Sequence, residues 1–403
     1  MIKQSYKVKA LSTVIVVITI GNIFSTHIIA AENTTKSISI HTAKPDATTY
    51  VKYSLGPVDL HDAIKKIGSS TGLMDFYALA VLKQANIDFN GIFTVKNPLE
   101  PKIIYHQERA KENASQWLHT LKPKIISIHQ QIVNYTTRFQ NYHKSLLAAI
   151  DNKDKETLTN GLTRLSISIS ENQAEVNRLV ESLKEFKINM TEDTQMFKED
   201  AHQLTLILAS QDAGIPFLQN QITAFNDAIN QYNTLMIGVS IGTTLSPIAL
   251  IGGSVLIATG AGTPLGTAFI VGGTMAASGG VAGITSAWEE LKHAQNVIQK
   301  ISSQISHAQI QVAGLTNFQN QTEFLTSTID TTISALQNIS DQWHTIERRY
   351  NFLLQNIKIM DVQDMNFIKE DLNKSTDNWI SVQEYAQKVN TTNIKISNTN
   401  KLT

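Results

Sequence analysis

Histidines are the side chains of this sequence best suited to metal or acid–base chemistry, but their spacing fits neither. The chain has 11 of them, including His106, His119, His129, His143 and His202. No two stand in the His-Glu-x-x-His arrangement that holds zinc on one helix face. We expect most of the 11 to lie on solvated helix faces.

Acidic pairs and glycines give no catalytic motif either. Adjacent acids such as Glu289 and Glu290 are typical of a helix surface. The glycines between residues 252 and 283 are not followed by Gly-Lys-Ser/Thr, so they form no phosphate loop. His293 and His307 flank that glycine-rich segment and could sense endosomal acidity, although surface histidines would look the same. The sequence predicts a protein that is not an enzyme and has no metal or cofactor.

Composition and charge exclude further classes. The 403 residues contain no cysteine, which excludes disulfide frameworks, thiolate metal sites and cysteine nucleophiles. Basic and acidic residues number 34 each, and residues 1–31 hold three lysines and no acid. The remainder therefore has 31 basic and 34 acidic side chains, a net charge of about −3. A nearly neutral body argues against electrostatic binding of nucleic acid.

Residues 1–31 have the parts of a secretory signal peptide. A lysine-bearing start precedes an apolar stretch at residues 10–20, and Ala30 and Ala31 offer a cleavage site. The apolar stretch is shorter than the roughly 20 residues that span a bilayer core. We expect export, followed by a flexible N-terminal segment at residues 32–54.

Two long segments carry the heptad spacing of packed helices. Apolar residues recur at steps of three and four through residues 125–149 and again through residues 158–207. The spacing predicts two rods joined by a turn at residues 151–154, the second about 75 Å long. Polar residues in the second seam either set the register or mark where the bundle loosens. They are Asn172, Asp193 and Asp200.

Weaker patterns predict the rest of the architecture. Residues 57–67 and 73–85 read as two short helices, a third long pattern covers residues 291–357, and a last helix covers residues 362–389. Such long helices must bury their seams against one another. We expect a mainly all-α fold, an elongated antiparallel bundle of four or five long helices.

One segment between these helices has no charge at all. Residues 228–288, a run of 61, lack Asp, Glu, Lys, Arg and His, and residues 235–285 hold 12 of the 20 glycines. Two apolar stretches, 235–257 and 264–284, flank a turn, and each is long enough to span a bilayer. The candidate membrane-inserting residues are Leu235, Met236, Ile237, Val239, Ile241, Leu245, Ile248, Leu250, Ile251, Val255, Leu256, Ile257, Leu265, Phe269, Ile270, Val271, Val281 and Ile284.

Neither stretch is apolar enough for a committed transmembrane helix. The large apolar residues of the first contribute about −3 to −7 kcal/mol to insertion and those of the second about −2 to −4 kcal/mol. The Gly, Ser, Thr and Pro residues of each stretch cancel part of this favourable insertion free energy. Such a balance suits a hairpin that folds against soluble helices first and inserts later. Its glycines and β-branched residues leave a helical and a β conformation open.

Three interpretations of this hairpin compete. It could be the buried core of a soluble bundle, or two permanent transmembrane helices of an anchored coiled-coil structural or sensory protein. It could also be a conditional insertion element of a secreted pore former. A charge-free run of this length is hard to bury in a thin bundle, and the residues favour the third interpretation.

Several short segments occur in a characteristic order along the chain after residue 52. They are YSLGP (53–57), MDFYA (74–78), AKENASQWL (110–118), LKP (121–123), FKED (197–200), LAS (208–210), AGIP (213–216), ALQNISDQW (335–343) and FIKEDL (367–372). Together these segments resemble the haemolysin BL and non-haemolytic enterotoxin components of the Bacillus cereus group. No catalytic residues accompany this resemblance.

The resemblance implies a three-component α-helical pore-forming toxin with a fold similar to cytolysin A. A long tail bundle would carry a head with the hydrophobic hairpin, drawn in some members as a β-tongue. The domains would be bundle at 55–234, hairpin at 235–285, bundle again at 286–391 and a C-terminal tail at 392–403.

The resemblance also implies partners and a destination. The chain would be a secreted haemolysin or enterotoxin component that binds target-cell membrane lipid. It would assemble with two other toxin components and with itself into a lytic pore. An alternative is a docking subunit that does not span the bilayer, because the tail segments are closest to the haemolysin BL binding component. The apolar segment of that component is short, whereas the one here is long.

Overall fold

The computed structural model describes residues 54–57, 60–83, 86, 99–209, 219, 223, 227, 251–257, 268–274, 307–391 and 396–398. All of these fall within the unit Asp46–Thr403. The expected signal peptide, residues 32–53 and most of the charge-free segment lie outside the described residues.

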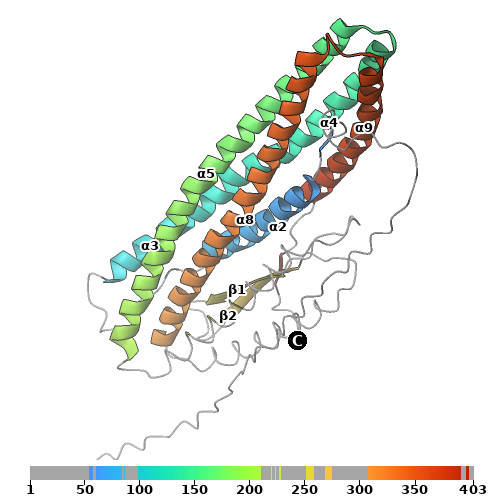
Figure 1. Ribbon diagram of the computed structural model, residues 1–403. Helices are drawn as coiled ribbons and strands as arrows, with labels where there is room; N and C mark the ends of the chain where they lie inside the picture. Colours follow the sequence, from blue (N-terminus) through green and yellow to red (C-terminus); the bar gives the residue numbers. More distant parts are fainter. Residues whose placement is uncertain are drawn as a thin grey trace, which may run out of the picture. The chain divides into compact units, whose positions relative to one another are not determined.

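The described helices form a bundle of long rods that run alongside one another (Figure 1). Helix α5 pairs lengthwise with α8, α4 with α9, and α2 with α8. With 55 residues, α5 is roughly 80 Å long. The all-α architecture expected from the heptad seams is confirmed. The helical elements are α2 (Leu60–Lys83), α3 (Leu99–Gln116), the π-helical turn η1 (Trp117–Leu121), α4 (Lys122–Asp151), α5 (Lys155–Ala209), α8 (His307–Asn356) and α9 (Val362–Thr391).

The heptad seams form the core, as their spacing predicts. Phe139 on α4 and Leu162 on α5 are completely buried, and the polar seam residues Asp193 and Asp200 are buried as fully. The turn expected at residues 151–154 is confirmed: α4 ends at Asp151 and α5 begins at Lys155. Its backbone includes Lys153 at a φ of 57°, the left-handed conformation that closes a tight turn.

An aromatic cluster fastens α4, α8 and α9 together. The rings of Trp343 and Trp379 are stacked with centroids 5.4 Å apart, and the ring of Tyr135 lies 4.7 Å from that of Trp379. The Tyr135 hydroxyl donates to that of Tyr350 over 3.1 Å. Burial raises the pKa of both tyrosines, so they stay neutral. This cluster is an apolar, well-satisfied part of the core.

Residues 54–57 are anchored in the same part of the bundle. The Leu55 amide donates to Asp371 Oδ2 over 2.7 Å, and Trp379 Nε1 donates to the Leu55 carbonyl over 3.3 Å. A Cβ on Gly56 would come within 2.9 Å of Ser375 Oγ and 3.1 Å of its Cα, so only glycine fits this close approach. The start of the helical region is therefore held by side chains of α9.

Helix α2 corrects one expectation. The sequence predicted two short helices at 57–67 and 73–85, but the structure has one continuous helix, Leu60–Lys83. Within it, the Ser70 hydroxyl donates to the Lys66 carbonyl and accepts from Thr332 Oγ1 of α8. Gly68 lies against the Val389 side chain of α9. Tertiary packing therefore outweighs the poor helix propensity of the Gly-Ser-Ser-Thr-Gly run.

Within the described residues, three strands accompany the helices. Strand β1 (Ile251–Ile257) pairs antiparallel with β2 (Ala268–Thr274), from Ile251 opposite Thr274 to Ile257 opposite Ala268. Strand β3 (Ile396–Asn398) pairs antiparallel with the other edge of β2, so the sheet order is β1-β2-β3.

Candidate functional site

The two paired strands carry part of the expected insertion element. Seven of the 18 candidate residues lie on them: Ile251, Val255, Leu256 and Ile257 on β1, and Phe269, Ile270 and Val271 on β2. Their register brings Val255 opposite Ile270 and Leu256 opposite Phe269. Of the two conformations that the composition leaves open, these segments adopt the β form. The other candidates lie outside the described residues: Leu235, Met236, Ile237, Val239, Ile241, Leu245, Ile248, Leu250, Leu265, Val281 and Ile284.

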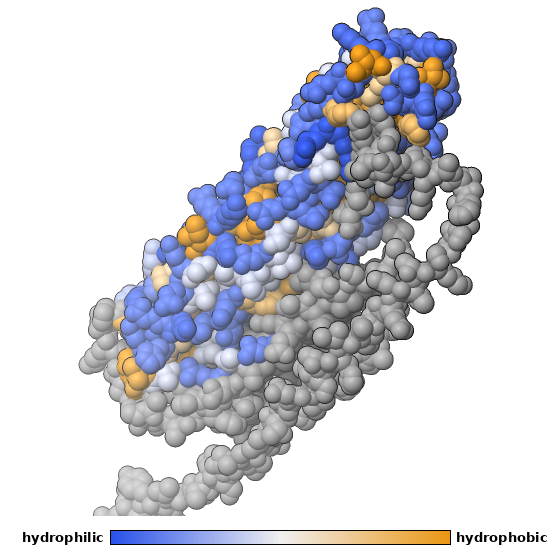
Figure 2. Space-filling model, in the orientation of Figure 1, coloured by the Kyte–Doolittle hydropathy of each residue, from blue (hydrophilic) through white to orange (hydrophobic). Residues whose placement is uncertain are grey.

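In the part of the chain that the structure describes, no helix combines the length and the apolarity needed to cross a membrane. Figure 2 shows that the coloured face of the bundle is mainly hydrophilic, with small separate apolar spots. The large apolar side chains exposed on the described residues are Tyr105, Ile126, Ile167, Ile188, Leu206, Ile359 and Val362.

A second feature is a row of polar contacts between α3 and α5. His106 Nδ1 lies 2.5 Å from Asp200 Oδ2, and Lys102 Nζ lies 3.4 Å from Asp200 Oδ1. Farther along α3, Asn113 Nδ2 donates to Asp193 Oδ2 over 2.6 Å, and Arg109 Nε lies 3.0 Å from Asp193 Oδ1. The four α3 residues follow steps of four, three and four, so they share one helix face. We call these four residues, together with Asp193 and Asp200, the polar row.

The carboxylates of the polar row are buried and incompletely satisfied. Asp193 and Asp200 have no exposed side-chain surface. Their Oδ1 atoms accept no hydrogen bond although cations lie nearby. Burial raises the pKa of Asp193 to about 6, partly offset by the Asn113 hydrogen bond and by the charges of Arg109 and His106. An ionised Asp193 therefore weakens the folded bundle at neutral pH.

This raised pKa predicts an unusual pH dependence. The stability contributed by a protonated Asp193 is complete below the pKa of an unfolded aspartate, about 3.9, and is lost as the pH rises through about 6. Relative to the variant Asp193→Asn, the wild type should gain about 1 kcal/mol of unfolding free energy between pH 7.5 and pH 5. Urea denaturation at both pH values measures the difference. Equal pH dependence in the two proteins would contradict the assignment.

A smaller polar contact holds the turn between α3 and α4. Trp117 Nε1 donates to Asp75 Oδ1 of α2 over 2.9 Å, and Lys122 Nζ lies 2.5 Å from Asp75 Oδ2. Burial raises the pKa of Asp75, and Lys122 and Trp117 offset the shift. All three residues fall within or beside the segments MDFYA, AKENASQWL and LKP. Through Asp75, Trp117 and Lys122, these three segments contact one another across the bundle.

Two histidines depart from the solvated position that is expected for most of them. His106 is 5% exposed and His129 is 3% exposed, because both face the bundle core. His143, which lies on the surface, has its Nε2 2.9 Å from Asn373 Oδ1. Across the described ranges, no group of three His, Asp or Glu side chains could hold a metal ion. His293 and the side chain of His307 lie outside the described atoms.

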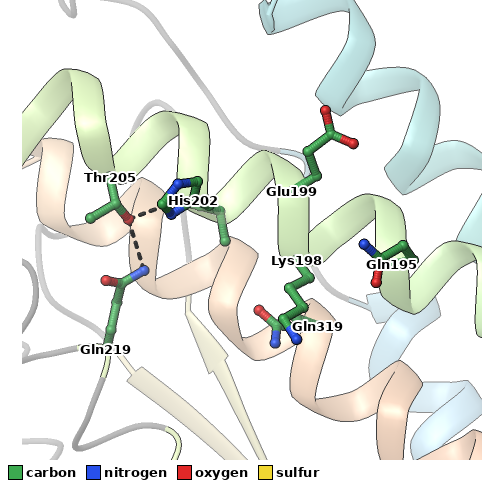
Figure 3. A pocket seen from close by; sticks show the side chains of 8 residues that line it. Gln195, Lys198, Glu199, His202, Thr205, Gln219 and Gln319 are labelled. Carbon is green, nitrogen blue, oxygen red and sulfur yellow. Dashed lines mark hydrogen bonds between the residues drawn. The ribbon is translucent and has the colours of Figure 1, made fainter.

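A shallow pocket of about 470 Å³ lies beside α5. Figure 3 shows Lys198 and Gln319 close together and Glu199 pointing away from them. Gln219 Nε2 donates to Thr205 Oγ1 over 3.0 Å at the other end. The remaining lining residues are Gln195, Ala201 and His202. Its side chains offer no nucleophile–base pair and no set of converging metal ligands.

Comparison with known proteins gives a family match over the first bundle part. Residues 54–232 match the model of Bacillus haemolytic enterotoxin (HBL). A curated relative from Bacillus cereus, described as an uncharacterized protein in the hblA 3′ region, is 28% identical over 104 residues. That match covers 26% of this chain and 66% of the relative, just under two thirds of its length.

Solved structures share the fold along most of the chain. The Bacillus cereus HblL1 toxin component is 28% identical with a TM-score of 0.73, covering 86% of this chain and 100% of its own. Soluble SmhA of the tripartite α-pore-forming toxin Smh from Serratia marcescens is 17% identical with a TM-score of 0.67, covering 84% and 94%. The AhlB pore of the tripartite toxin AHL from Aeromonas hydrophila reaches 16% identity and a TM-score of 0.52, covering 85% and 97%. The last two show a common fold alone.

Proposed function

On the premise that this chain is a relative of the Bacillus haemolytic enterotoxin (HBL) family, we propose that it is one component of a secreted pore-forming toxin. Pore formation needs no catalytic residue, which agrees with the absence of a catalytic motif in the sequence. The observation that carries the proposal is the charge-free run of 61 residues set between the helices of an HBL-like bundle.

The proposed insertion element is the segment 235–285. The bundle parts 55–234 and 286–391 would keep the segment soluble until contact with a membrane or a partner triggers its release. The pairing of β1 with β2 supports this role, because antiparallel pairing satisfies backbone hydrogen bonds without charged side chains. Helices formed from the same residues, or strands of several copies paired into a closed sheet, could enter lipid with every backbone group satisfied.

The proposed partners are target-cell lipid, two further toxin components and other copies of this chain. Smh and AHL are described as tripartite, and the AhlB structure is a pore. We infer a similar set here, delivered by secretion with residues 1–31 as the signal peptide. A docking subunit of the same set, which binds cells without spanning the bilayer, is the second candidate, because several segments resemble the haemolysin BL binding component.

The test is flotation of the purified secreted protein with dye-loaded liposomes, followed by protease digestion and mapping of residues 235–285. Protection of this segment together with dye release, either alone or after addition of the two partners, is the expected result. A segment that stays cleavable on membranes being lysed by the complete set would overturn the insertion role and leave the docking role. Recovery of the chain in the producing cell's membrane would contradict secretion.

A further inference from the structure

Helices α3 and α4 form one nearly continuous rod with a single break. In η1 the Lys122 amide donates to the Trp117 carbonyl, five residues back. Pro123 has no amide hydrogen and therefore leaves the His119 carbonyl without its helical donor. The buried residues Asn113, Trp117, Leu121 and Ile125 follow steps of four, which is one residue more than a heptad allows. The π-helical turn accommodates that extra residue.

Helix α2 fixes the position of this break. Asp75 binds the Trp117 indole on one side and the Lys122 ammonium on the other, so it contacts both ends of η1. Packing of the Trp117 ring near Phe186 of α5 adds an apolar contact, with centroids 6.3 Å apart. The turn is therefore a fixed point from which the two helices extend.

The two sides of the break differ in how they are held. Among its buried residues, α3 has Leu99 and Ile103 as the only large aliphatic side chains; the others are alanines or polar residues. Helix α4 buries a long apolar seam and carries Tyr135 and Phe139 of the aromatic cluster. Apolar burial contributes about 25 cal/mol per Å², so α4 is fastened far more strongly than α3.

Helix α3 meets α5 through the polar row and through the ion pairs of Lys102 with Glu199 and of Arg109 with Glu192, and its other neighbour is α2. Buried ion pairs of this kind are weak contributors, since desolvation offsets their attraction, and apolar replacement is often neutral or stabilising. The unsatisfied Oδ1 atoms and the raised pKa of Asp193 agree with a costly interface. Arg109 and His106 on α3 and Glu192 on α5 are the charges that act on Asp193.

We propose that α3 is a detachable arm, which separates from α2 and α5 as a unit by pivoting about η1 while α4, α8 and α9 stay packed. This inference rests on the proposed function in one respect: separation of the arm would precede assembly of the pore. The separation itself is a property of the soluble protein.

Amide hydrogen exchange of the soluble full chain at neutral pH tests the separation directly. We expect residues 99–116 to open while residues 125–149 stay protected. The amides of residues 99–116 should therefore exchange at least roughly tenfold faster than those of residues 125–149. Equal protection of both ranges would show that α3 opens only with the whole bundle, and would overturn the proposal.

Two variants test whether the polar row sets the opening. His106→Leu with Asp200→Leu replaces the buried pair by apolar side chains, and Asp193→Asn removes the buried charge while leaving an acceptor for Asn113. Each should slow exchange of residues 99–116 roughly tenfold without changing that of residues 125–149. Glu181→Ala with Lys184→Ala, a surface pair on α5, is the matched control and should change neither. If neither variant slows amide exchange of residues 99–116, the polar row does not control the opening.

Lysis by the complete component set then connects the arm to assembly. The variants with slowed α3 exchange should lyse cells more slowly by a similar factor. Unchanged lysis with slowed exchange would overturn the link to assembly. Because hydrogen exchange needs no membrane, a failure of the wild type to form pores would count against the proposed function and not against the arm.

Discussion

Lysines at Val255 and Ile270 are expected to abolish lysis while the helical bundle stays folded. The two residues are opposite each other in the β1–β2 register, so both charges would enter the membrane at the same depth. A lysine at the bilayer centre costs about 2.5 to 3.5 kcal/mol in a helix and about 2 to 4 kcal/mol in a strand. The combined cost of the two lysines, about 4 to 8 kcal/mol, is comparable with the gain of about 5 to 11 kcal/mol from both apolar stretches, part of which Gly, Ser, Thr and Pro already cancel. This cost applies to the strand form, because in a helix covering 235–257 Val255 would lie within one turn of the hairpin tip and away from the bilayer centre.

Haemolysis by the complete component set measures this effect, and circular dichroism with thermal melting checks the fold. Ile126→Lys with Ile188→Lys is the matched control, because both isoleucines are exposed on the bundle and should tolerate charge. Full lysis by the Val255→Lys, Ile270→Lys protein would show that this hairpin does not enter the bilayer as paired strands. Loss of lysis in the control protein as well would assign the effect to a changed bundle surface.

The sequence predicts the helical bundle well because heptad spacing is a local signal. Residues such as Leu162 and Phe139 are placed in the core by their spacing alone, and the structure buries both completely. The turn at residues 151–154 follows from the same spacing. The run of four-residue steps through Trp117 and Leu121 was also visible and could have located the π-helical turn.

Contacts between residues that are far apart in the chain could not be predicted from the sequence. The burial of His106 could not be predicted, because nothing near it in the chain reveals its partner Asp200, 94 residues away. The division of α2 into two helices fails for the same reason, since the partner of Ser70 is Thr332 on another helix. The membrane-inserting role of all 18 candidates, those on β1 and β2 included, stays a prediction from composition.

Trp379→Ala is expected to have the largest effect on stability. The indole is completely buried, stacked on Trp343 and close to Tyr135, and it donates to the Leu55 carbonyl. Removing it leaves a cavity and an unpaired carbonyl, a loss of about 3 to 5 kcal/mol. Because native proteins have only about 5 to 15 kcal/mol of unfolding free energy in total, this loss is a large share of the stability. Guanidinium denaturation measures the change.

Trp379→Phe separates the two contributions of this side chain. Phenylalanine keeps most of the ring packing but cannot donate to the Leu55 carbonyl, so the expected loss is smaller, about 1 to 2 kcal/mol. The anchored residues 54–57 should then become more sensitive to protease before the bundle unfolds. Tyr105→Ala, at a side chain 60% exposed, is the control and should change stability by no more than about 0.5 kcal/mol. If Trp379→Ala lowers stability no more than this control, the aromatic cluster does not fasten α4, α8 and α9. The inference that α4 is packed more strongly than α3 would then lose its main support.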